Sequence, residues 1–312
     1  MRRGRFRDTG YRMSNHEYHL SHTDADAAPW MGRLLAHVVL RLGRFSPFRL
    51  ASGPLNRRLR REGGVPFKAP ASDGVPLDAI FLPARREIPQ RLPVIMAHGY
   101  TEIKEFHARH AALLQRHGHD VVLFDLRAHG RSGGRITTLG AFEKHDFSAV
   151  IDEAQRRGLI EGRVITRGYS TSAAAAIQHA PLDERVAGLI AIAPFVDLAG
   201  AIRSFRRMLG GWYDEEKLLA GFAAVARRAG FSFADSRTDE AIRQLKVPLL
   251  LVAGDADRNL PPALHAEVLA RQFPHERCEF LRIAGAGHVS IYRRTWPLLD
   301  EATLRFCASV ET

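Results

Sequence analysis

The chain has 312 residues, of which 46% are hydrophobic and 25% charged, so its composition is that of a globular protein and excludes a disordered one. Its formal net charge of +11 is concentrated at the N-terminus, because residues 1–62 hold 13 Arg against 5 acidic residues and the rest of the chain carries only +3. The cysteines, Cys278 and Cys307, have neither metal-ligand nor disulfide spacing, which fits a reducing compartment.

Two segments precede the main domain. Residues 1–29 are polar and rich in Arg, so we expect a basic flexible tail, and no secretory signal because no apolar stretch follows the first arginines. Residues 30–62 are predicted to form an amphipathic basic helical segment whose apolar run is too short and too interrupted to span a bilayer. Its apolar face comprises Leu34, Leu35, Val38, Val39, Leu42 and Phe45. Its other face comprises Arg33, His37, Arg41 and Arg44. Such a helix suits either a membrane interface or packing against the protein, and we favour packing.

Strand and helix patterns alternate from Val65 onward. Residues 65–69 and 76–82 predict an antiparallel hairpin that turns at 72–74. Buried parallel strands are predicted at 94–97, 121–125, 164–168, 189–193, 249–253 and 279–284. Helices are predicted at 104–117, 141–157, 171–179, 262–273 and 291–307. The pattern predicts an α/β fold with a mostly parallel, doubly wound sheet over residues 63–198 and 247–312.

The interval 199–246 interrupts this alternation. It is too long for one crossover helix between two strands, and it carries six large aromatic residues. We interpret it as a small helical lid inserted into the main domain. The alternative is a surface excursion whose aromatic residues pack on the main domain.

The strongest local signal is Gly168-Tyr169-Ser170-Thr171-Ser172, which follows a predicted strand and opens an Ala-rich helix. A nucleophile elbow requires this arrangement, with small residues two positions on either side of the serine. Ser172 stands where the G-x-S-x-G pattern has its second Gly, and we expect the turn to survive with slightly more crowding. The pentapeptide alone is a weak signal, and its context strengthens it.

Five motifs together resemble the α/β-hydrolase superfamily, nearer its serine-aminopeptidase-like and dienelactone-hydrolase-like branches than its lipases. They are PVIMAHGY at 93–100, FDLRAHGRS at 124–132, the elbow, GDAD at 254–257 and GAGH at 285–288. The resemblance covers residues 65–306, and it implies an α/β-hydrolase fold with a catalytic triad.

The resemblance implies Ser170 as nucleophile and His288 as base, and the family pattern G-x-x-D selects Asp257 as the acid, with Asp255 as the fallback. The order Ser, Asp, His along the chain is that of the hydrolase fold. In the family, the amide after His-Gly helps to form the oxyanion hole, which assigns the N–H groups of Tyr100 and Thr171.

The hypothesis is therefore a serine hydrolase that cleaves a carboxylic ester, or a related small acyl substrate, through an acyl-enzyme. The alternatives are an acyltransferase or a peptidase or amidase with the same triad, and a non-catalytic interaction module on a hydrolase scaffold. We expect no cofactor, no metal and no specific nucleic-acid partner. An anionic membrane surface is the partner considered for the basic helix, and the expected location is cytoplasmic or peripheral to a membrane.

Overall fold

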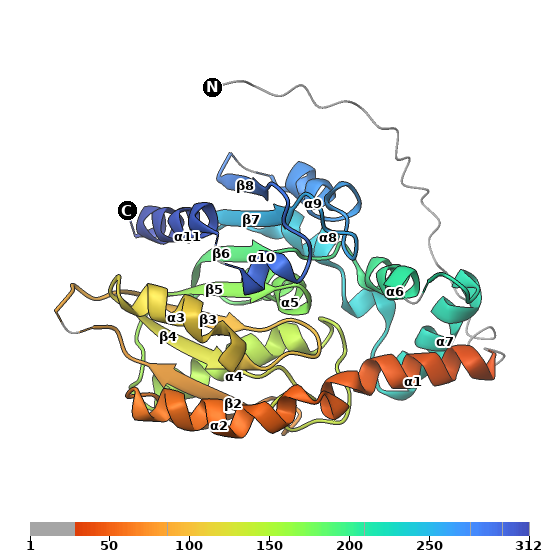
Figure 1. Ribbon diagram of the computed structural model, residues 1–312, viewed down its shortest axis with the longest axis horizontal. Coiled ribbons are helices and arrows are strands. Elements are labelled where there is room, and N and C mark those ends of the chain that lie inside the picture. Colours follow the sequence, from red (N-terminus) through yellow and green to blue (C-terminus); the bar gives the residue numbers. More distant parts are fainter. Residues whose placement is uncertain (1–28, 86, 209, 275, 295, 312) are drawn as a thin grey trace.

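A central sheet of eight strands organises the protein in the computed structural model, which describes residues 29–312 except 86, 209, 275, 295 and 312 (Figure 1). The strands are β1 (Val65–Pro70), β2 (Pro76–Leu82), β3 (Arg91–Ala97), β4 (His119–Phe124), β5 (Val164–Tyr169), β6 (Val186–Ile192), β7 (Leu249–Gly254) and β8 (Cys278–Ile283). Their order is β1-β2-β4-β3-β5-β6-β7-β8. The β1–β2 and β2–β4 pairs are antiparallel and the others parallel, so the predicted mostly parallel sheet is confirmed.

Helices cover both faces of the sheet because each central strand is apolar on both sides. In β4, Val122 and Phe124 enter one hydrophobic core, and Val121 and Leu123 enter the opposite one. The first core is covered by α4 (Glu143–Arg156), α5 (Thr171–His179), α8 (Thr238–Ala241) and α9 (Ala266–Gln272). The second is covered by α3 (Ala108–Gln115), α10 (Ser290–Arg293) and α11 (Pro297–Val310).

Three of the predicted helices are broken in the structure. The stretch 262–273 divides at His265 into a 3₁₀ turn, Pro262–Leu264, and α9. The stretch 291–307 is predicted to be one helix, but the structure divides it into α10 and α11, and α11 begins at Pro297. A proline disfavours helical backbone in the residue before it, which interrupts the helix. The stretch 104–117 consists of a 3₁₀ turn, Lys104–His107, followed by α3. The predicted hairpin turn is present, with Gly74 at φ 79°.

The N-terminal segment forms two helices, α1 (Trp30–Phe45) and α2 (Phe48–Arg61), that run end to end along one edge of the molecule (Figure 1). The predicted tail, apart from Pro29, lies outside the described residues. The protein-facing side of α1 differs from the predicted apolar face, because its buried residues are Gly32, Ala36, Val39, Leu40 and Gly43. Small residues replace the larger ones because α1 lies very close to its neighbours. A Cβ on Gly32 would lie 2.4 Å from the carbonyl oxygen of Lys217.

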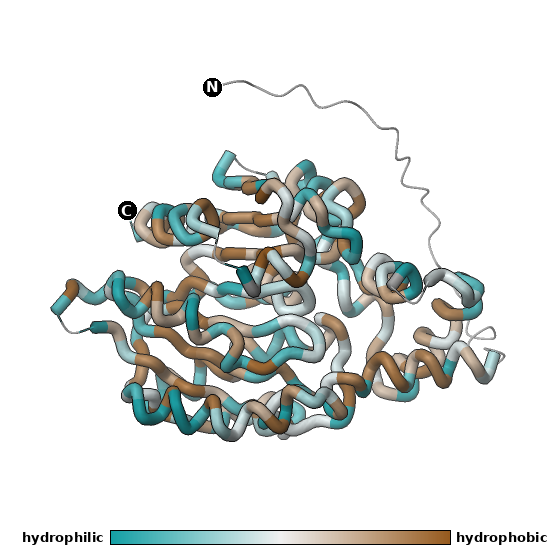
Figure 2. The backbone as a smooth tube through the Cα atoms, in the orientation of Figure 1, coloured by the Kyte–Doolittle hydropathy of each residue, from teal (hydrophilic) through white to brown (hydrophobic). Residues whose placement is uncertain are grey.

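The interval after β6 divides into two parts. Its first part, α6 (Leu198–Met208) and α7 (Glu215–Arg228), packs with α1 into a third apolar cluster beside the main domain. Its second part, residues 233–245, returns to the main core, where Ile242 and Leu245 are buried. Figure 2 shows α1 as largely hydrophobic, although it lies at the periphery. Among the described residues, no helix is both long and apolar enough to cross a bilayer.

Candidate active site

The turn between β5 and α5 carries Ser170 in a strained conformation. Its φ of 54° and ψ of −114° lie outside the regions that most side chains allow. A Cβ on Gly168 would lie 2.3 Å from the carbonyl oxygen of Ser172, so only glycine fits at that position. A turn of this kind holds a hydroxyl above the carboxyl ends of the strands.

Ser172 does more than crowd the turn. Its buried hydroxyl accepts a hydrogen bond from the Tyr169 N–H at 2.8 Å and is 2.9 Å from the carbonyl oxygen of Ala97, to which it donates. Ala97 ends β3 directly before His98 and Gly99. The serine therefore links the Ser170 turn to the loop that follows β3, a function that glycine could not provide.

The structure brings three of the predicted side chains together. His288 Nε2 lies 3.0 Å from Ser170 Oγ, and His288 Nδ1 lies 2.7 Å from Asp257 Oδ2. Both Ser170 and Asp257 are largely buried. This is the arrangement in which an imidazole can accept a hydroxyl proton while a carboxylate holds the other ring nitrogen protonated.

The two candidate acids occupy different places. The second oxygen of Asp257, Oδ1, accepts hydrogen bonds from the N–H groups of Asn259 at 2.9 Å and Leu260 at 2.8 Å, which fixes the carboxylate. Asp255 Oδ1 accepts from the Gly285 N–H at 2.7 Å at an exposed position. Asp255 thus joins two loops, and Asp257 is the one that contacts the histidine.

The His288 loop is held from below by an aromatic residue that the sequence did not single out. The Tyr169 hydroxyl donates to the carbonyl oxygen of His288 at 2.6 Å, and its ring stacks on Tyr292. On the other side of the loop, the Ser290 hydroxyl accepts from the Gly287 N–H at 2.9 Å. Tyr169 lies directly before Ser170 in the chain, so one residue connects the serine turn to the histidine loop.

The loop after β3 contains Tyr100, which together with Thr171 borders the same cavity as Ser170. The Gly99 N–H donates to Glu102 Oε2 at 3.1 Å. His98 is fully buried, and burial lowers its pKa to about 3, so the ring is neutral. Its Nε2 accepts from the Leu126 N–H at 3.1 Å, which leaves the proton on Nδ1 to bond the Gly99 carbonyl at 2.7 Å. His98 thus braces the loop.

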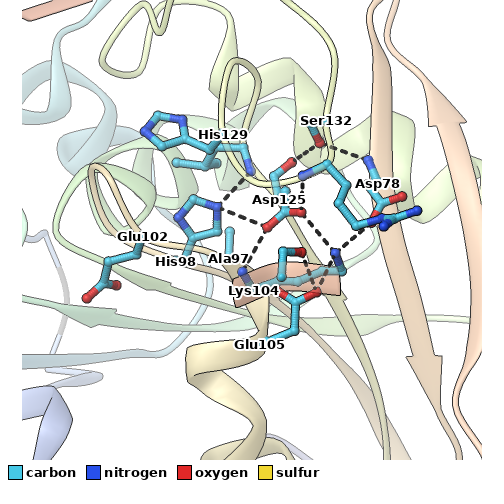
Figure 3. Close-up of polar contacts among 12 residues, drawn as sticks. Asp78, Ala97, His98, Glu102, Lys104, Glu105, Asp125, His129 and Ser132 are labelled. Atoms are coloured by element: carbon cyan, nitrogen blue, oxygen red, sulfur yellow. Dashed lines mark hydrogen bonds and ion pairs between the residues drawn. The ribbon is translucent and has the colours of Figure 1, made fainter. Parts of the chain in front are cut away.

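A buried charge cluster lies behind this loop (Figure 3). The Lys104 ammonium is 2.6 Å from Asp78 Oδ2, 2.9 Å from Asp125 Oδ2 and 3.1 Å from Glu105 Oε1. Burial alone would lower the pKa of Lys104, but the three carboxylates outweigh it and raise the pKa above its ordinary value. Asp125 also accepts from the Lys104 N–H at 2.8 Å. The cluster fixes where the loop after β3 re-enters the domain.

The N-terminal helices brace the same loop from outside. The Tyr100 hydroxyl donates to the carbonyl oxygen of Val39 in α1, and the Ser46 hydroxyl donates to the carbonyl oxygen of Thr101 at 2.7 Å. Thr101 has a φ of 62°, which is unusual for a β-branched residue and therefore needs such support. Phe48, the first residue of α2, borders the cavity itself.

Ser170 and His288 open into a cavity of about 190 Å³. Its walls come from the loop after β3, from α2, from the α6 region and from the loops after β4 and β7. The apolar and aromatic residues that line it are Phe48, Tyr100, Leu139, Tyr169, Phe195, Ala201, Phe205, Leu260 and Val289. Its walls therefore suit an apolar group of modest size.

Known proteins share parts of this sequence and this architecture. Residues 89–218 match the family model described as serine aminopeptidase, S33. A thiohydrolase, aneE, from Aspergillus aculeatus is 35% identical over 108 residues, which are 33% of this chain and 34% of that protein. An esterase of Pyrococcus furiosus has a similar structure, with a TM-score of 0.63 and 20% identity over 80% of this chain and 91% of the other. The α/β hydrolase GrgF from a Penicillium species has a TM-score of 0.63 and 19% identity over 80% and 99%.

The chain has the α/β-hydrolase fold. The family model and the neighbouring structures support an enzyme of the α/β-hydrolase type. The chain spans about a third of the length of the thiohydrolase that it matches. The match therefore does not assign that protein's activity to this chain.

This α/β-hydrolase site also contains residues that the sequence did not reveal. Tyr169 and Ser46 act through hydrogen bonds between distant segments, for which a single sequence carries no periodic or spacing signal. Glu102 bonds the Gly99 N–H within its own loop. His107 and His110, which share a helix face, are buried, and their rings contact Tyr292 at a tilt. Within the part of the chain that the structure describes, no group of three His, Cys, Asp or Glu side chains is placed to hold a metal ion.

Proposed function

We propose that this protein is a serine hydrolase that cleaves carboxylic esters through an acyl-enzyme intermediate. The observation that carries the proposal is the 3.0 Å contact between Ser170 Oγ and His288 Nε2 at the floor of an apolar cavity. The hydroxyl can pass its proton directly to the ring, and Asp257 holds that ring in the required tautomer.

The proposed reaction proceeds in two stages. Ser170 Oγ attacks the acyl carbonyl as His288 takes its proton, and the N–H groups of Tyr100 and Thr171 donate to the developing oxyanion. The protonated His288 then donates to the leaving alkoxide, which departs as an alcohol and leaves the acyl group on Ser170. A water molecule gives its proton to His288 and attacks the ester, which releases the acid and restores the serine.

The cavity favours an uncharged substrate with an apolar acyl or alcohol group. Among the described residues that line it, none is Lys or Arg, and Glu102 contributes a carboxylate. A substrate carboxylate would therefore meet no compensating cation, and burying an unpaired charge is costly. Thioesters react by the same acyl-transfer chemistry, and the cavity likewise favours thioesters with apolar groups.

A labelling experiment tests the nucleophile. A fluorophosphonate probe should modify the wild type at Ser170, located by peptide mass spectrometry, and should not modify Ser170→Ala. Ser72→Ala, at the hairpin turn far from the site, is the matched control and should be labelled like the wild type. If the wild type is not labelled, the remaining hypothesis is a non-catalytic module on this scaffold.

A substrate panel tests the reaction. Short and medium-chain esters should be turned over faster than thioesters and aminoacyl amides of equal size, and Ser170→Ala should be inactive. Faster cleavage of aminoacyl amides would favour a peptidase, the activity in the description of the matching family model. Transfer of the acyl group to added alcohol or amine, in preference to water, would favour an acyltransferase.

A further inference from the structure

Helix α1 presents a row of large apolar side chains to solvent. Their exposed fractions are 65% for Trp30, 49% for Leu34, 48% for Val38, 40% for Leu42 and 74% for Phe45. The spacing of four, four, four and three residues aligns them on one side of the helix. The buried side of α1 is made of other residues, Gly32, Ala36, Val39, Leu40 and Gly43, so the exposed row is not part of the core. We call these five residues the α1 row.

The charge along helices α1 and α2 has a single sign. Residues 30–61 include eight Arg and no Asp or Glu. Arg41 is exposed and, instead of lying on the opposite face as predicted, lies on the same side of α1 as Leu34 and Phe45 by helical spacing. Arg33 and Arg44 fall beside them. Arginine side chains beside a row of Trp, Leu and Phe can extend toward phosphate groups while the apolar side chains enter the acyl region.

The combination of large apolar side chains and positive charge distinguishes between the partners that could bind the α1 row. A second copy placed about a two-fold axis would bring the Arg residues of one α1 row against those of the other, which is unfavourable. Nucleic acid offers phosphates but has no apolar layer to bury five large side chains. A bilayer with anionic headgroups satisfies both the charge and the apolar side chains at once.

We propose that α1 docks the protein on the surface of an anionic bilayer, with the α1 row inserted below the headgroups and the helix lying in the plane of the membrane. The helix remains attached to the protein while it does so, because its opposite side packs on α7 through the close contact of Gly32 and Gly221. Docking therefore requires no unfolding of the domain.

The α1 row ends next to the active-site cavity. Phe45 precedes Ser46, whose hydroxyl bonds Thr101, and both Thr101 and Phe48 border the cavity. A docked molecule would hold this wall of the cavity close to the bilayer. If the proposed esterase function is correct, on which this consequence rests, apolar esters dissolved in the membrane are substrates delivered from that side.

Vesicle co-sedimentation of the full chain tests the docking. The wild type should partition onto phosphatidylcholine vesicles containing phosphatidylserine and should bind pure phosphatidylcholine much more weakly, since each Arg near an anionic surface is worth about a fivefold change in partitioning. Leu34→Glu combined with Val38→Glu should lower partitioning at least tenfold. The matched control is Leu182→Glu, at an exposed leucine on the main domain, and it should bind like the wild type.

Two readouts accompany the binding measurement. Circular dichroism and hydrolysis of a short, water-soluble ester should be unchanged in the Leu34→Glu/Val38→Glu variant, which shows that the domain is intact. Hydrolysis of a long-chain ester carried in anionic vesicles should fall in that variant and stay at the wild-type level in Leu182→Glu. If the wild type hydrolysed neither ester, the esterase proposal would be refuted and the docking result would still stand.

Three results would overturn the docking proposal. The first is wild-type partitioning no greater than that of the Leu34→Glu/Val38→Glu variant. The second is equal binding to anionic and neutral vesicles. The third is a dimer, measured by light scattering, that the double variant converts to monomer while vesicle binding is absent, which would assign the α1 row to a second copy of the chain.

Discussion

Replacing Asp257 with Asn tests the proposed triad through its least ambiguous geometric feature. Asp257 Oδ1 accepts hydrogen bonds from two backbone N–H groups, those of Asn259 and Leu260, and Oδ2 contacts His288 Nδ1. In Asp257→Asn the amide oxygen should keep the two backbone bonds, because the NH₂ group cannot accept them. The NH₂ group then faces His288 Nδ1, which must become an acceptor.

The consequence is the wrong tautomer at the nucleophile. With Nδ1 unprotonated, the neutral ring carries its proton on Nε2, which faces Ser170 Oγ at 3.0 Å and can no longer accept the hydroxyl proton. The same exchange in a serine protease triad lowers kcat about 10⁴-fold, which corresponds to about 5 kcal/mol of transition-state stabilisation. Because both backbone bonds survive, the free energy of unfolding should change by less than about 1 kcal/mol.

Steady-state hydrolysis of a p-nitrophenyl ester measures this prediction, with urea denaturation as the stability control. Asp255→Asn is the matched variant, since Asp255 bonds only the Gly285 N–H among the contacts described and should retain kcat within about twofold. More than a tenth of wild-type kcat in Asp257→Asn, or a collapse of kcat in Asp255→Asn, would refute the assignment of Asp257 as the acid.

Four further predictions concern the groups that hold the site and the N-terminal helix in place. Ser172→Ala leaves a buried N–H and a buried carbonyl without their partner, and it should cost about 2 kcal/mol, or about 3 °C in Tm for a chain of this length. Lys104→Met leaves the buried carboxylates of Asp125 and Glu105 without their cation and should cost about 3–5 kcal/mol in urea denaturation. Burial alone would raise the pKa of Asp125, but the Lys104 ammonium and the hydrogen bond from the Arg131 N–H outweigh it and lower the pKa to about 2, so its contribution to stability should be present above pH ~4 and be lost as the pH falls toward 2. Gly221→Ala would place a Cβ 2.2 Å from the backbone of Gly32 and should destabilise the α1–α7 packing by about 1–3 kcal/mol, measured by thermal unfolding.

Three of these predictions would be contradicted by the following outcomes. An unchanged Tm in Ser172→Ala would mean that other groups or water replace the hydroxyl. A stability of the wild type that does not change between pH 4 and pH 2 would contradict the depressed pKa of Asp125. Gly53→Ala is the control for Gly221→Ala, because it lies in α2 with no crowding atom and should be neutral or stabilising. Equal effects of the two glycine changes would contradict close packing at Gly221.

The sequence by itself determined the parallel sheet and the positions of its reactive loops. Apolar runs that alternate with helical patterns predict strands buried on both faces, and these strands form the sheet with boundaries shifted by only a few residues. Since parallel strands end at one edge of a sheet, a serine after β5, a carboxylate after β7 and a histidine after β8 could be expected at the same edge. The elbow motif added the local backbone constraint at Gly168.

Only the tertiary structure decided which groups meet. Asp255 and Asp257 are two residues apart and chemically identical, and the choice between them depends on loop geometry that no periodicity encodes. The face of α1 that packs was also decided in three dimensions, because only small residues fit where α7 approaches Gly32 and where the His129 ring approaches Gly43. Helical periodicity identifies an apolar face, but the distance to the neighbouring helix determines whether large or small side chains fill it.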